Sequence, residues 1–232
     1  MKAVILAGGL GERLRPFTQA IPKPLLPIGE QSLLEIQITN LARHGFEEIF
    51  IATNYKSEYI ENFIGNGNQF KVRITYSREL KPLGTCGPLS LLRGQLDEPF
   101  ILMNGDILTA MDFGRFYDYG RKQRSDFTIA TKNVGTPFNF GKVHTVGDRI
   151  VRVEEKPQFL TEVLAGIYFL KPPMLELVPD NEYFGIPDLI DKMLALGRPV
   201  MRYLMQEYWL DIGRVEDYSE AEEAYRTHFA VK

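Results

Sequence analysis

The stretch Ala3-Val4-Ile5-Leu6-Ala7-Gly8-Gly9-Leu10-Gly11 decides the fold of this 232-residue chain. A continuous apolar run that ends in glycines is typical of a buried parallel strand that delivers a loop to a ligand. Because three of the four residues after Ala7 have no side chain, backbone N–H groups can approach anionic oxygens closely there. The stretch therefore predicts an anion-binding loop at the end of a central strand.

Positive charge is concentrated around this loop. Lys2, Arg13, Arg15 and Lys23 against the single acid Glu12 give residues 1–29 a net charge of +3, whereas the whole chain carries −3. A basic glycine-rich loop in an otherwise acidic protein favours a small polyphosphate ligand, and it argues against nucleic acid as a partner.

The loop lacks two common phosphate-binding motifs. The dinucleotide motif Gly-x-Gly-x-x-Gly fails because Leu14 occupies the place of the third glycine. No Gly-Lys-Ser/Thr triplet occurs in the chain, which makes an ordinary P-loop NTPase a poor match. The glycines by themselves would also fit a tight strand-to-helix turn without a ligand, so residues beyond Gly11 have to decide between the two.

The composition, with 44% hydrophobic and 25% charged residues, is ordinary for a globular protein. We expect one domain over residues 1–232, with a nucleotide-binding half of about residues 1–125 and a second lobe of about 126–232. The sequence shows no secretory signal and no apolar run of the ~20 residues that a membrane helix needs. A single cysteine, Cys86, fits a reducing compartment. We therefore expect a cytoplasmic protein without a membrane segment.

Strand-like and helix-like patterns alternate through the first half of the chain. The predicted strands cover residues 3–7, 49–53, 72–76 and 100–104, and the predicted helices cover residues 33–44, 57–64 and 85–96. Such alternation with short connections predicts βαβ units, a mostly parallel sheet and a three-layer α/β/α sandwich.

The second half has a mixed pattern. We expect strands over residues 127–131, 142–144, 150–154, 163–170, 200–204 and 208–210, and helices over residues 186–196 and 215–229. No linker, low-complexity run or internal repeat interrupts it, and the hexapeptide repeats that build a β-helix are absent. We therefore expect no β-helix tail.

Three polar segments follow predicted strands: the glycine loop, residues 79–87, and Asp106. Ligands of open α/β sheets bind outside the carboxyl ends of the strands, so these segments predict one shared pocket. Mg²⁺ prefers one or two carboxylates together with substrate phosphates, and Asp106 could supply one of them. A second carboxylate is offered by Asp211 in Trp209-Leu210-Asp211-Ile212-Gly213, although sequence spacing alone does not bring the two together.

The combined pattern Gly8-Gly9-x-Gly11-x-Arg13-x-x-Pro16, with Pro22-Lys23-Pro24 downstream, resembles the signature of the sugar-1-phosphate nucleotidyltransferases, also called nucleotide-sugar pyrophosphorylases. The resemblance runs from Lys2 to about Glu223. It implies a Rossmann-like nucleotide-diphospho-sugar transferase fold and the Mg²⁺-dependent transfer of a nucleoside monophosphate from an NTP to a sugar 1-phosphate. It also implies catalytic roles for Arg13 and Lys23 and metal-binding roles for Asp106 and Asp211.

The segment from Glu79 to Leu89, ELKPLGTCGPL, is similar to the base-reading segment of GDP-mannose pyrophosphorylases, with Cys86 in place of alanine. The resemblance favours GTP and a mannose or heptose 1-phosphate as substrates. A uridylyl- or thymidylyltransferase and a non-catalytic regulatory module with the same fold are the alternatives. The implied nucleotide-binding residues are Leu6, Ala7, Gly8, Gly9, Gly11, Glu79, Pro82, Gly84, Thr85 and Gly87.

Three further segments resemble the family's sugar-phosphate site: Phe140-Gly141, Glu154-Glu155-Lys156-Pro157 and Ala165-Gly166-Ile167-Tyr168. Leu164 departs from the family pattern, which usually has asparagine before Ala-Gly-Ile-Tyr. The implied sugar-phosphate-binding residues are Asn104, Gly141, Glu155, Lys156 and Gly166.

The residue types suit this reaction. A sugar phosphate with a second pKa of ~6 is already ionised at pH 7, so the attack needs no general base. The barrier comes from repulsion between two polyanions, which positioned cations relieve. We assign Arg13 to the leaving pyrophosphate and Lys23 to the α-phosphate or the incoming sugar phosphate. The sequence does not determine the oligomeric state and is compatible with a homo-oligomer.

Overall fold

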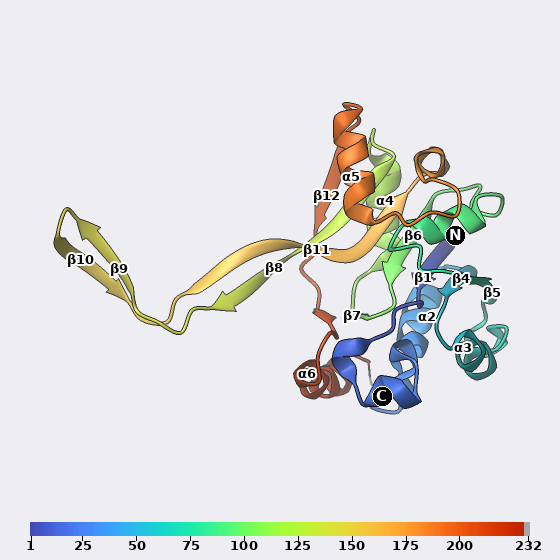
Figure 1. Ribbon diagram of the computed structural model, residues 1–232, viewed down its shortest axis with the longest axis horizontal. Coiled ribbons are helices and arrows are strands. Elements are labelled where there is room, and N and C mark those ends of the chain that lie inside the picture. Colours follow the sequence, from blue (N-terminus) through green and yellow to red (C-terminus); the bar gives the residue numbers. More distant parts are fainter. Residues whose placement is uncertain (230–232) are drawn as a thin grey trace.

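A seven-stranded sheet forms the centre of the computed structural model, which describes residues 1–229 (Figure 1). The strands β6, β1, β4 and β5 are parallel neighbours, β12 is parallel to β8, and β11 is antiparallel to both β8 and β6. The predicted, mostly parallel sheet is confirmed. Its strands, in spatial order, are β12 (Val200–Leu204), β8 (Phe127–Pro137), β11 (Gln158–Leu170), β6 (Phe100–Asn104), β1 (Lys2–Leu6), β4 (Glu48–Thr53) and β5 (Arg73–Arg78).

The apolar run at the start of the chain becomes the central strand β1, whose residues Ala3, Val4 and Ile5 are fully buried. Its last residue, Leu6, lies opposite Asn104 of β6 and Ala52 of β4. The carboxyl ends of these three parallel strands therefore meet at one edge of the sheet. The glycine loop leaves the sheet at that edge.

Two hydrophobic clusters cover the two faces of the sheet. One cluster joins the sheet to α2 (Leu33–Arg43), α3 (Ser57–Ile64) and α4 (Phe113–Lys122). The other joins it to α5 (Ile186–Ala195) and to two 3-10 segments, η4 (Gly87–Leu92) and η5 (Pro172–Leu177). Apolar side chains on both faces make the three-layer α/β/α sandwich that the sequence predicts.

The start of α2 follows the expected chemistry. The Ser32 hydroxyl accepts a hydrogen bond from the Glu35 N–H at 3.2 Å, and the Glu35 carboxylate accepts one from the Ser32 N–H at 2.7 Å. This reciprocal capping box satisfies two of the N–H groups that a helix leaves unpaired at its start. Gly45, with a φ of +83°, lies just beyond the helix, close to the predicted end.

The helix predicted over residues 85–96 is wrong. The segment forms only the 3-10 turn η4, because the Cys86 and Gly87 N–H groups both donate to the Phe184 carbonyl at 2.9 Å. The Thr85 hydroxyl also accepts a hydrogen bond from the Ile186 N–H at 2.9 Å. These contacts to a distant segment replace the local hydrogen bonds that a regular helix would make.

The strands predicted over residues 127–131 and 163–170 are longer than expected. Beyond the central sheet, β8 and β11 continue as a two-stranded ribbon, paired from Leu164 opposite Thr131 to Gln158 opposite Pro137. The hairpin of β9 (Lys142–Val146) and β10 (Arg149–Glu154) extends this ribbon (Figure 1). We call residues 133–160 the arm. It projects far from the rest of the molecule.

The C-terminal part returns to the edge where the glycine loop lies. The strand β13 (Trp209–Asp211) pairs with β7 (Ile107–Thr109) so that Asp211 lies opposite Ile107. A third cluster packs α6 (Glu216–Ala224) and Tyr225 of the adjoining π-helical turn η6 (Tyr225–Phe229) against Leu33 of α2. The short elements are α1 (Phe17–Ala20), β2 (Pro27–Ile28), β3 (Gln31–Ser32) and the 3-10 turns η1 (Glu12–Leu14), η2 (Lys23–Leu25) and η3 (Asn68–Phe70).

No helix between residues 1 and 229 has the length and apolar character needed to cross a membrane.

Candidate active site

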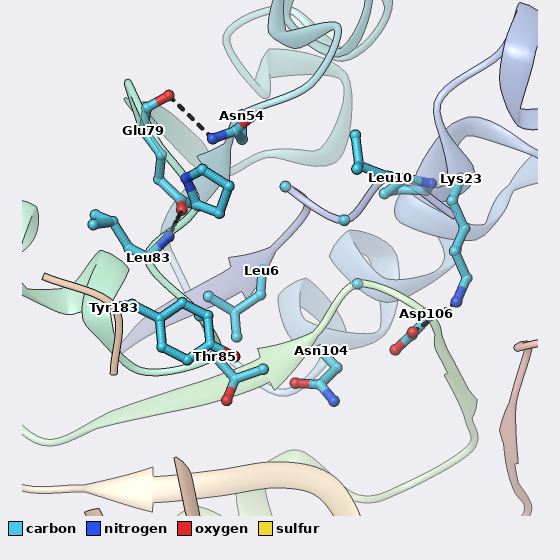
Figure 2. A pocket seen from close by; sticks show the side chains of 16 residues that line it. Leu6, Leu10, Lys23, Asn54, Glu79, Leu83, Thr85, Asn104, Asp106 and Tyr183 are labelled. Atoms are coloured by element: carbon cyan, nitrogen blue, oxygen red, sulfur yellow. Dashed lines mark hydrogen bonds and ion pairs between the residues drawn. The ribbon is translucent and has the colours of Figure 1, made fainter. Parts of the chain in front are cut away.

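A cavity of about 360 Å³ opens at the carboxyl ends of the central strands (Figure 2). Three segments far apart in the sequence surround it: the glycine loop, residues 79–85, and residues 104–106. The shared pocket that the sequence predicts is therefore present. The predicted site residues that line it are Leu6, Gly8, Gly9, Lys23, Glu79, Pro82, Gly84, Thr85, Asn104 and Asp106.

Gly11 and Thr18 determine the shape of the glycine loop. Gly11 has a φ of +61°, in the left-handed region that other residues adopt only with strain. The Thr18 hydroxyl donates a hydrogen bond to the Gly11 carbonyl at 2.8 Å, and a Cβ on Gly11 would lie 2.7 Å from Thr18 Cγ2. Gly11 thus shapes the turn, whereas Gly8 and Gly9 line the cavity itself.

Replacing Gly11 with alanine is expected to lower the free energy of unfolding by about 1–3 kcal/mol, because it adds strain and a steric clash. Gly9→Ala is the matched control, since a Cβ on Gly9 would meet nothing within 4 Å. Chemical denaturation of both variants measures the difference. Equal stability of the two variants would contradict this account of the loop.

Lys23 enters the cavity from the short 3-10 turn Lys23–Leu25, which begins after Pro22. The Leu25 N–H donates to the Pro22 carbonyl at 2.8 Å, and this hydrogen bond fixes the turn. The Lys23 side chain is 10% exposed, and its Nζ lies 2.7 Å from Oδ2 of Asp106 (Figure 2). A nearly buried ammonium group therefore stands at the cavity wall, beside a carboxylate.

Asp106 and Asp211, predicted as a metal-binding pair, lie on adjoining segments. The Ile212 N–H donates to the Asp106 carbonyl at 3.0 Å, which holds the two segments together. Partial burial and the negative charge of Asp106 raise the pKa of Asp211, while Lys23 and Arg13 oppose this shift. A second carboxylate close enough to disfavour the ionisation of Asp211 makes a place for a cation.

The donor set fits Mg²⁺. Oδ1 of Asp106 is buried and has no hydrogen-bond partner among the described residues. Within residues 1–229, no group of three or more His, Cys, Asp and Glu side chains could hold a metal ion. A metal here would therefore depend on the two aspartates and on oxygen atoms of the substrate, the arrangement that Mg²⁺ usually adopts.

Glu79 shapes the segment that faces the glycine loop. Its carboxylate accepts a hydrogen bond from the Leu83 N–H at 2.9 Å, and its carbonyl accepts one from the Asn54 side chain at 3.3 Å (Figure 2). Burial raises the pKa of Glu79, and the hydrogen bond from Leu83 opposes the shift. The carboxylate thus closes a turn in the segment that lines the cavity.

Gly84 and Gly87 have different positions. Gly84 lines the cavity and has a φ of +79°, and a Cβ there would lie 2.8 Å from the Phe184 carbonyl oxygen. Gly87 lies outside the cavity lining, and its missing side chain makes room for the Glu182 carbonyl oxygen, 2.5 Å from the position of a Cβ. Cys86 between them is fully buried, and burial raises the pKa of its thiol to about 12. It is a packing residue.

Ala7, Arg13 and Gly166 adjoin the cavity without lining it. Ala7 is buried and donates a backbone hydrogen bond to Ala52 of β4 at 2.8 Å. The exposed Arg13 reaches toward the Asp211 side of the site, since its guanidinium lies 3.1 Å from the position of a Cβ on Gly213. Gly166, with a φ of +70°, leaves room for the Asn104 amide, which would lie 2.8 Å from a Cβ there.

The three remaining predicted residues, Gly141, Glu155 and Lys156, lie in the arm, and the structure does not bring them to the cavity. They are close to one another, because the Glu155 carboxylate would lie 3.3 Å from a Cβ on Gly141. Lys156 has a φ of +45°, which is rare for a residue other than glycine.

Sequence reasoning missed six residues of the cavity lining. Asn54 and Gly105 each come directly after a parallel strand, so their position at a strand end was a usable signal. Leu10, Pro24 and Leu83 stand inside the motifs that the sequence singled out. No sequence pattern indicates Tyr183 as a site residue, because it lies in a loop that only the tertiary fold brings to the cavity.

Known proteins are similar to this chain in sequence and fold. The family model described as nucleotidyl transferase matches residues 2–228. A probable mannose-1-phosphate guanylyltransferase 1 of Oryza sativa subsp. japonica is 33% identical, over 94% of this chain and 63% of that protein. A UTP–glucose-1-phosphate uridylyltransferase of Synechocystis sp. is also 33% identical, over 95% of this chain and 62% of that protein. The chain spans about three fifths of the length of these curated relatives.

Two solved structures have the same fold. The crystal structure of a putative glucose-1-phosphate thymidylyltransferase from Bacillus anthracis matches with a TM-score of 0.81 and 26% identity, over 100% of this chain and 98% of that one. HddC from Yersinia pseudotuberculosis, complexed with GMP-PN, matches with a TM-score of 0.74 and 26% identity, over 97% of this chain and 99% of that one. Because the family model matches residues 2–228 of the 232 residues, the chain belongs to the nucleotidyl transferase family.

Proposed function

We propose that the protein transfers a nucleoside monophosphate from an NTP to a sugar 1-phosphate and releases pyrophosphate. The observation that carries the proposal is the cavity in which the glycine loop faces Lys23, with Asp106 and Asp211 at its side. Loop amides, a nearly buried cation and a carboxylate pair are the groups that a transfer between two phosphates needs.

In the proposed reaction, a phosphate oxygen of the sugar 1-phosphate attacks the α-phosphorus of the NTP. A new P–O bond forms, the bond from the α-phosphorus to the bridging oxygen breaks, and pyrophosphate leaves with the bonding electrons. No proton has to be removed from the nucleophile. In keeping with this, the described residues of the cavity lining include no histidine.

The main task of the chain is to hold two polyanions in line. The backbone of Gly8 and Gly9 would bind the NTP phosphates, while Lys23 would offset the negative charge on the α-phosphate or the sugar phosphate. Arg13, at the exposed end of the loop, would bind the departing pyrophosphate. Asp106 and Asp211 would hold Mg²⁺, which supplies further charge stabilisation to the phosphate oxygens when it is bound.

GTP and a mannose or heptose 1-phosphate are the proposed substrates. Support comes from the ELKPLGTCGPL segment, from relatives named mannose-1-phosphate guanylyltransferase and from the neighbour complexed with GMP-PN. A uridylyl- or thymidylyltransferase is the second candidate, because a relative and a structural neighbour carry those names. We propose the cytoplasm as the compartment, because a single free cysteine, Cys86, fits a reducing environment.

A substrate panel tests the proposal. Pyrophosphate release is measured with Mg²⁺, each NTP including dTTP, and a set of sugar 1-phosphates. We expect release only when a sugar 1-phosphate is present, and the fastest release with GTP. Release with every NTP in the absence of a sugar would indicate a hydrolase instead. Binding of a nucleotide or a nucleotide sugar without release in any combination would favour a non-catalytic regulatory module.

A further inference from the structure

Gln37 is a buried amide side chain that lies outside the lining of the cavity. It belongs to α2 and is 3% exposed. Its Nε2 atom donates one hydrogen bond to the Asn104 carbonyl at 3.0 Å and a second to the Ile107 carbonyl at 2.8 Å. Burying an amide costs free energy unless its hydrogen bonds are made, so these two bonds are what the buried position provides for.

The two carbonyl groups enclose the turn that carries Asp106. Asn104 ends β6 and Ile107 begins β7, with Gly105 and Asp106 between them. Asn104 and Asp106 both line the cavity (Figure 2). The Nε2 atom of Gln37 therefore joins the two ends of the turn that holds a proposed Mg²⁺ ligand.

The backbone of this turn has two further supports. The Gly105 N–H donates to the Leu6 carbonyl at 2.9 Å, which ties the turn to β1. The Asp106 carbonyl accepts from the Ile212 N–H at 3.0 Å, which ties it to the segment after β13. Among the described residues, Gln37 is the one side chain that donates a hydrogen bond to the backbone of the turn. It supplies the support from the helical layer.

The same helix holds the other partner of the Asp106 ion pair. The Leu33 N–H, at the start of α2, donates to the Leu26 carbonyl at 3.2 Å, just after the turn that carries Lys23. Leu25 of that turn packs in the same hydrophobic cluster as α2. Because α2 contacts both turns, it fixes the position of the Lys23 ammonium group relative to the Asp106 carboxylate.

The two carbonyl groups also determine the orientation of the Gln37 amide. The reversed orientation would place its Oε1 atom against two carbonyl oxygens, which are all acceptors. In the observed orientation Oε1 is buried and has no hydrogen-bond partner among the described residues, and the same holds for Oδ1 of Asn104 and Oδ1 of Asp106. Buried acceptors without a donor cost free energy. Gln37 thus leaves one acceptor unpaired while it fixes two, which favours a role in shaping this turn.

From these observations we infer that Gln37 is a positioning residue, which sets the shape of the turn over residues 104–107 and thereby the place of the Asp106 carboxylate. The effect on the turn is inferred from the hydrogen bonds alone. The consequence for the metal rests on the proposed function, because it presumes Mg²⁺ at Asp106.

The first test is amide hydrogen exchange in the protein without metal or nucleotide. Gln37→Met keeps the length of the side chain and removes both N–H donors. We expect the Gly105 amide to exchange at least about tenfold faster in this variant, because a turn with fewer supports opens more often. The amides of β1 report global unfolding and serve as the internal reference. An unchanged Gly105 rate relative to β1 would overturn the inference.

Asn40→Leu is the matched control. Asn40 lies one turn further along α2 and also donates to two carbonyl groups, those of Thr109 and Met111, each at 3.2 Å. Its replacement removes an equal number of hydrogen bonds from the other end of β7 and should leave the Gly105 rate unchanged. The same acceleration in Asn40→Leu would show a general loosening of the fold and would overturn the inference.

Gln37→Glu serves as a second variant in case Gln37→Met does not fold. Its carboxylate places oxygen atoms against the two carbonyl groups, so it should loosen the turn more than methionine does. A folded Gln37→Glu protein with the wild-type exchange rate at Gly105 would likewise contradict the assigned role.

The second test is the binding of Mn²⁺ as a probe for the metal, with GTP present and no sugar phosphate. Enhanced relaxation of water protons distinguishes Mn²⁺ with GTP on the protein from the same pair in solution. We expect Gln37→Met to bind about tenfold more weakly than the wild type, and Asn40→Leu to bind equally well. Wild-type affinity in Gln37→Met would overturn the inference. A wild type that binds no Mn²⁺, together with faster Gly105 exchange in Gln37→Met, would contradict the proposed metal site and support the role of Gln37 in the turn.

Discussion

Replacing Lys23 with alanine is expected to lower the turnover of the proposed transfer at least about a hundredfold. The Lys23 side chain is 10% exposed, and its ammonium group lies at the cavity wall, 2.7 Å from Oδ2 of Asp106. A charge pair at ~4 Å is worth about 4 kcal/mol at an effective dielectric of ~20. If most of this interaction develops in the transition state, its loss costs roughly two to three decades of rate. Steady-state kinetics measures the change.

The variant also leaves Asp106 without its ion-pair partner, so a loss of folding has to be separated from a loss of catalysis. Lys23→Met keeps much of the apolar stem and serves as a second variant, with circular dichroism as the test of folding. Lys2→Ala is a matched control, because Lys2 is a similarly buried lysine that pairs with Asp97 and Glu48 at the opposite end of β1. Near-wild-type turnover of folded Lys23→Met would rule out the assigned role.

The sequence predicts the sheet and the cavity well because local signals and tertiary position agree there. The apolar run before Gly8 has the pattern of a strand buried on both faces of a sheet. The carboxyl ends of parallel strands lie at one edge of that sheet. Asp106 is found by this rule alone. Lys23 and Asp211 come from the resemblance to a family, since neither has a local pattern that directs it to the site.

The sequence is less informative where distant segments decide the local structure. The helix expected over residues 85–96 is replaced by a 3-10 turn, because the Phe184 carbonyl accepts hydrogen bonds from the N–H groups of Cys86 and Gly87. Tyr183 reaches the cavity from the same distant segment. No sequence pattern within residues 85–96 or around Phe184 indicates that the two segments are in contact.

The arm shows a different limit. Alternating side chains in residues 142–154 predict strands correctly, yet alternation says only that one face is covered and not by what. The sequence resemblance implies that Gly141, Glu155 and Lys156 belong to the sugar site, and the structure separates them from the cavity of their own chain. The local pattern of the arm carries no signal for its position relative to the cavity, because that position depends on the register of β8 and β11 in the central sheet.

Replacing Asp211 with asparagine is expected to separate metal binding from folding. The substitution removes one charge from a carboxylate pair whose repulsion, together with burial, raises the pKa of Asp211. An acid with a raised pKa in the folded state is less favourably ionised there than in the unfolded chain, so its charge opposes folding above the unfolded pKa. Without Mg²⁺ at neutral pH, Asp211→Asn should therefore be at least as stable as the wild type.

The activity of Asp211→Asn is expected to fall, although its stability is not. Loss of one of the two predicted ligands should lower turnover by about two decades or more and raise the Mg²⁺ concentration needed for half-maximal rate. In thermal unfolding with a nucleotide present, Mg²⁺ should stabilise the wild type more than the variant, because a ligand stabilises only the state that binds it. Glu216→Gln, which removes an exposed charge from α6, is the control and should behave as the wild type. An Asp211→Asn variant that keeps the full Mg²⁺-dependent stabilisation would exclude Asp211 as a ligand and leave Asp106 with the substrate phosphates as the metal site.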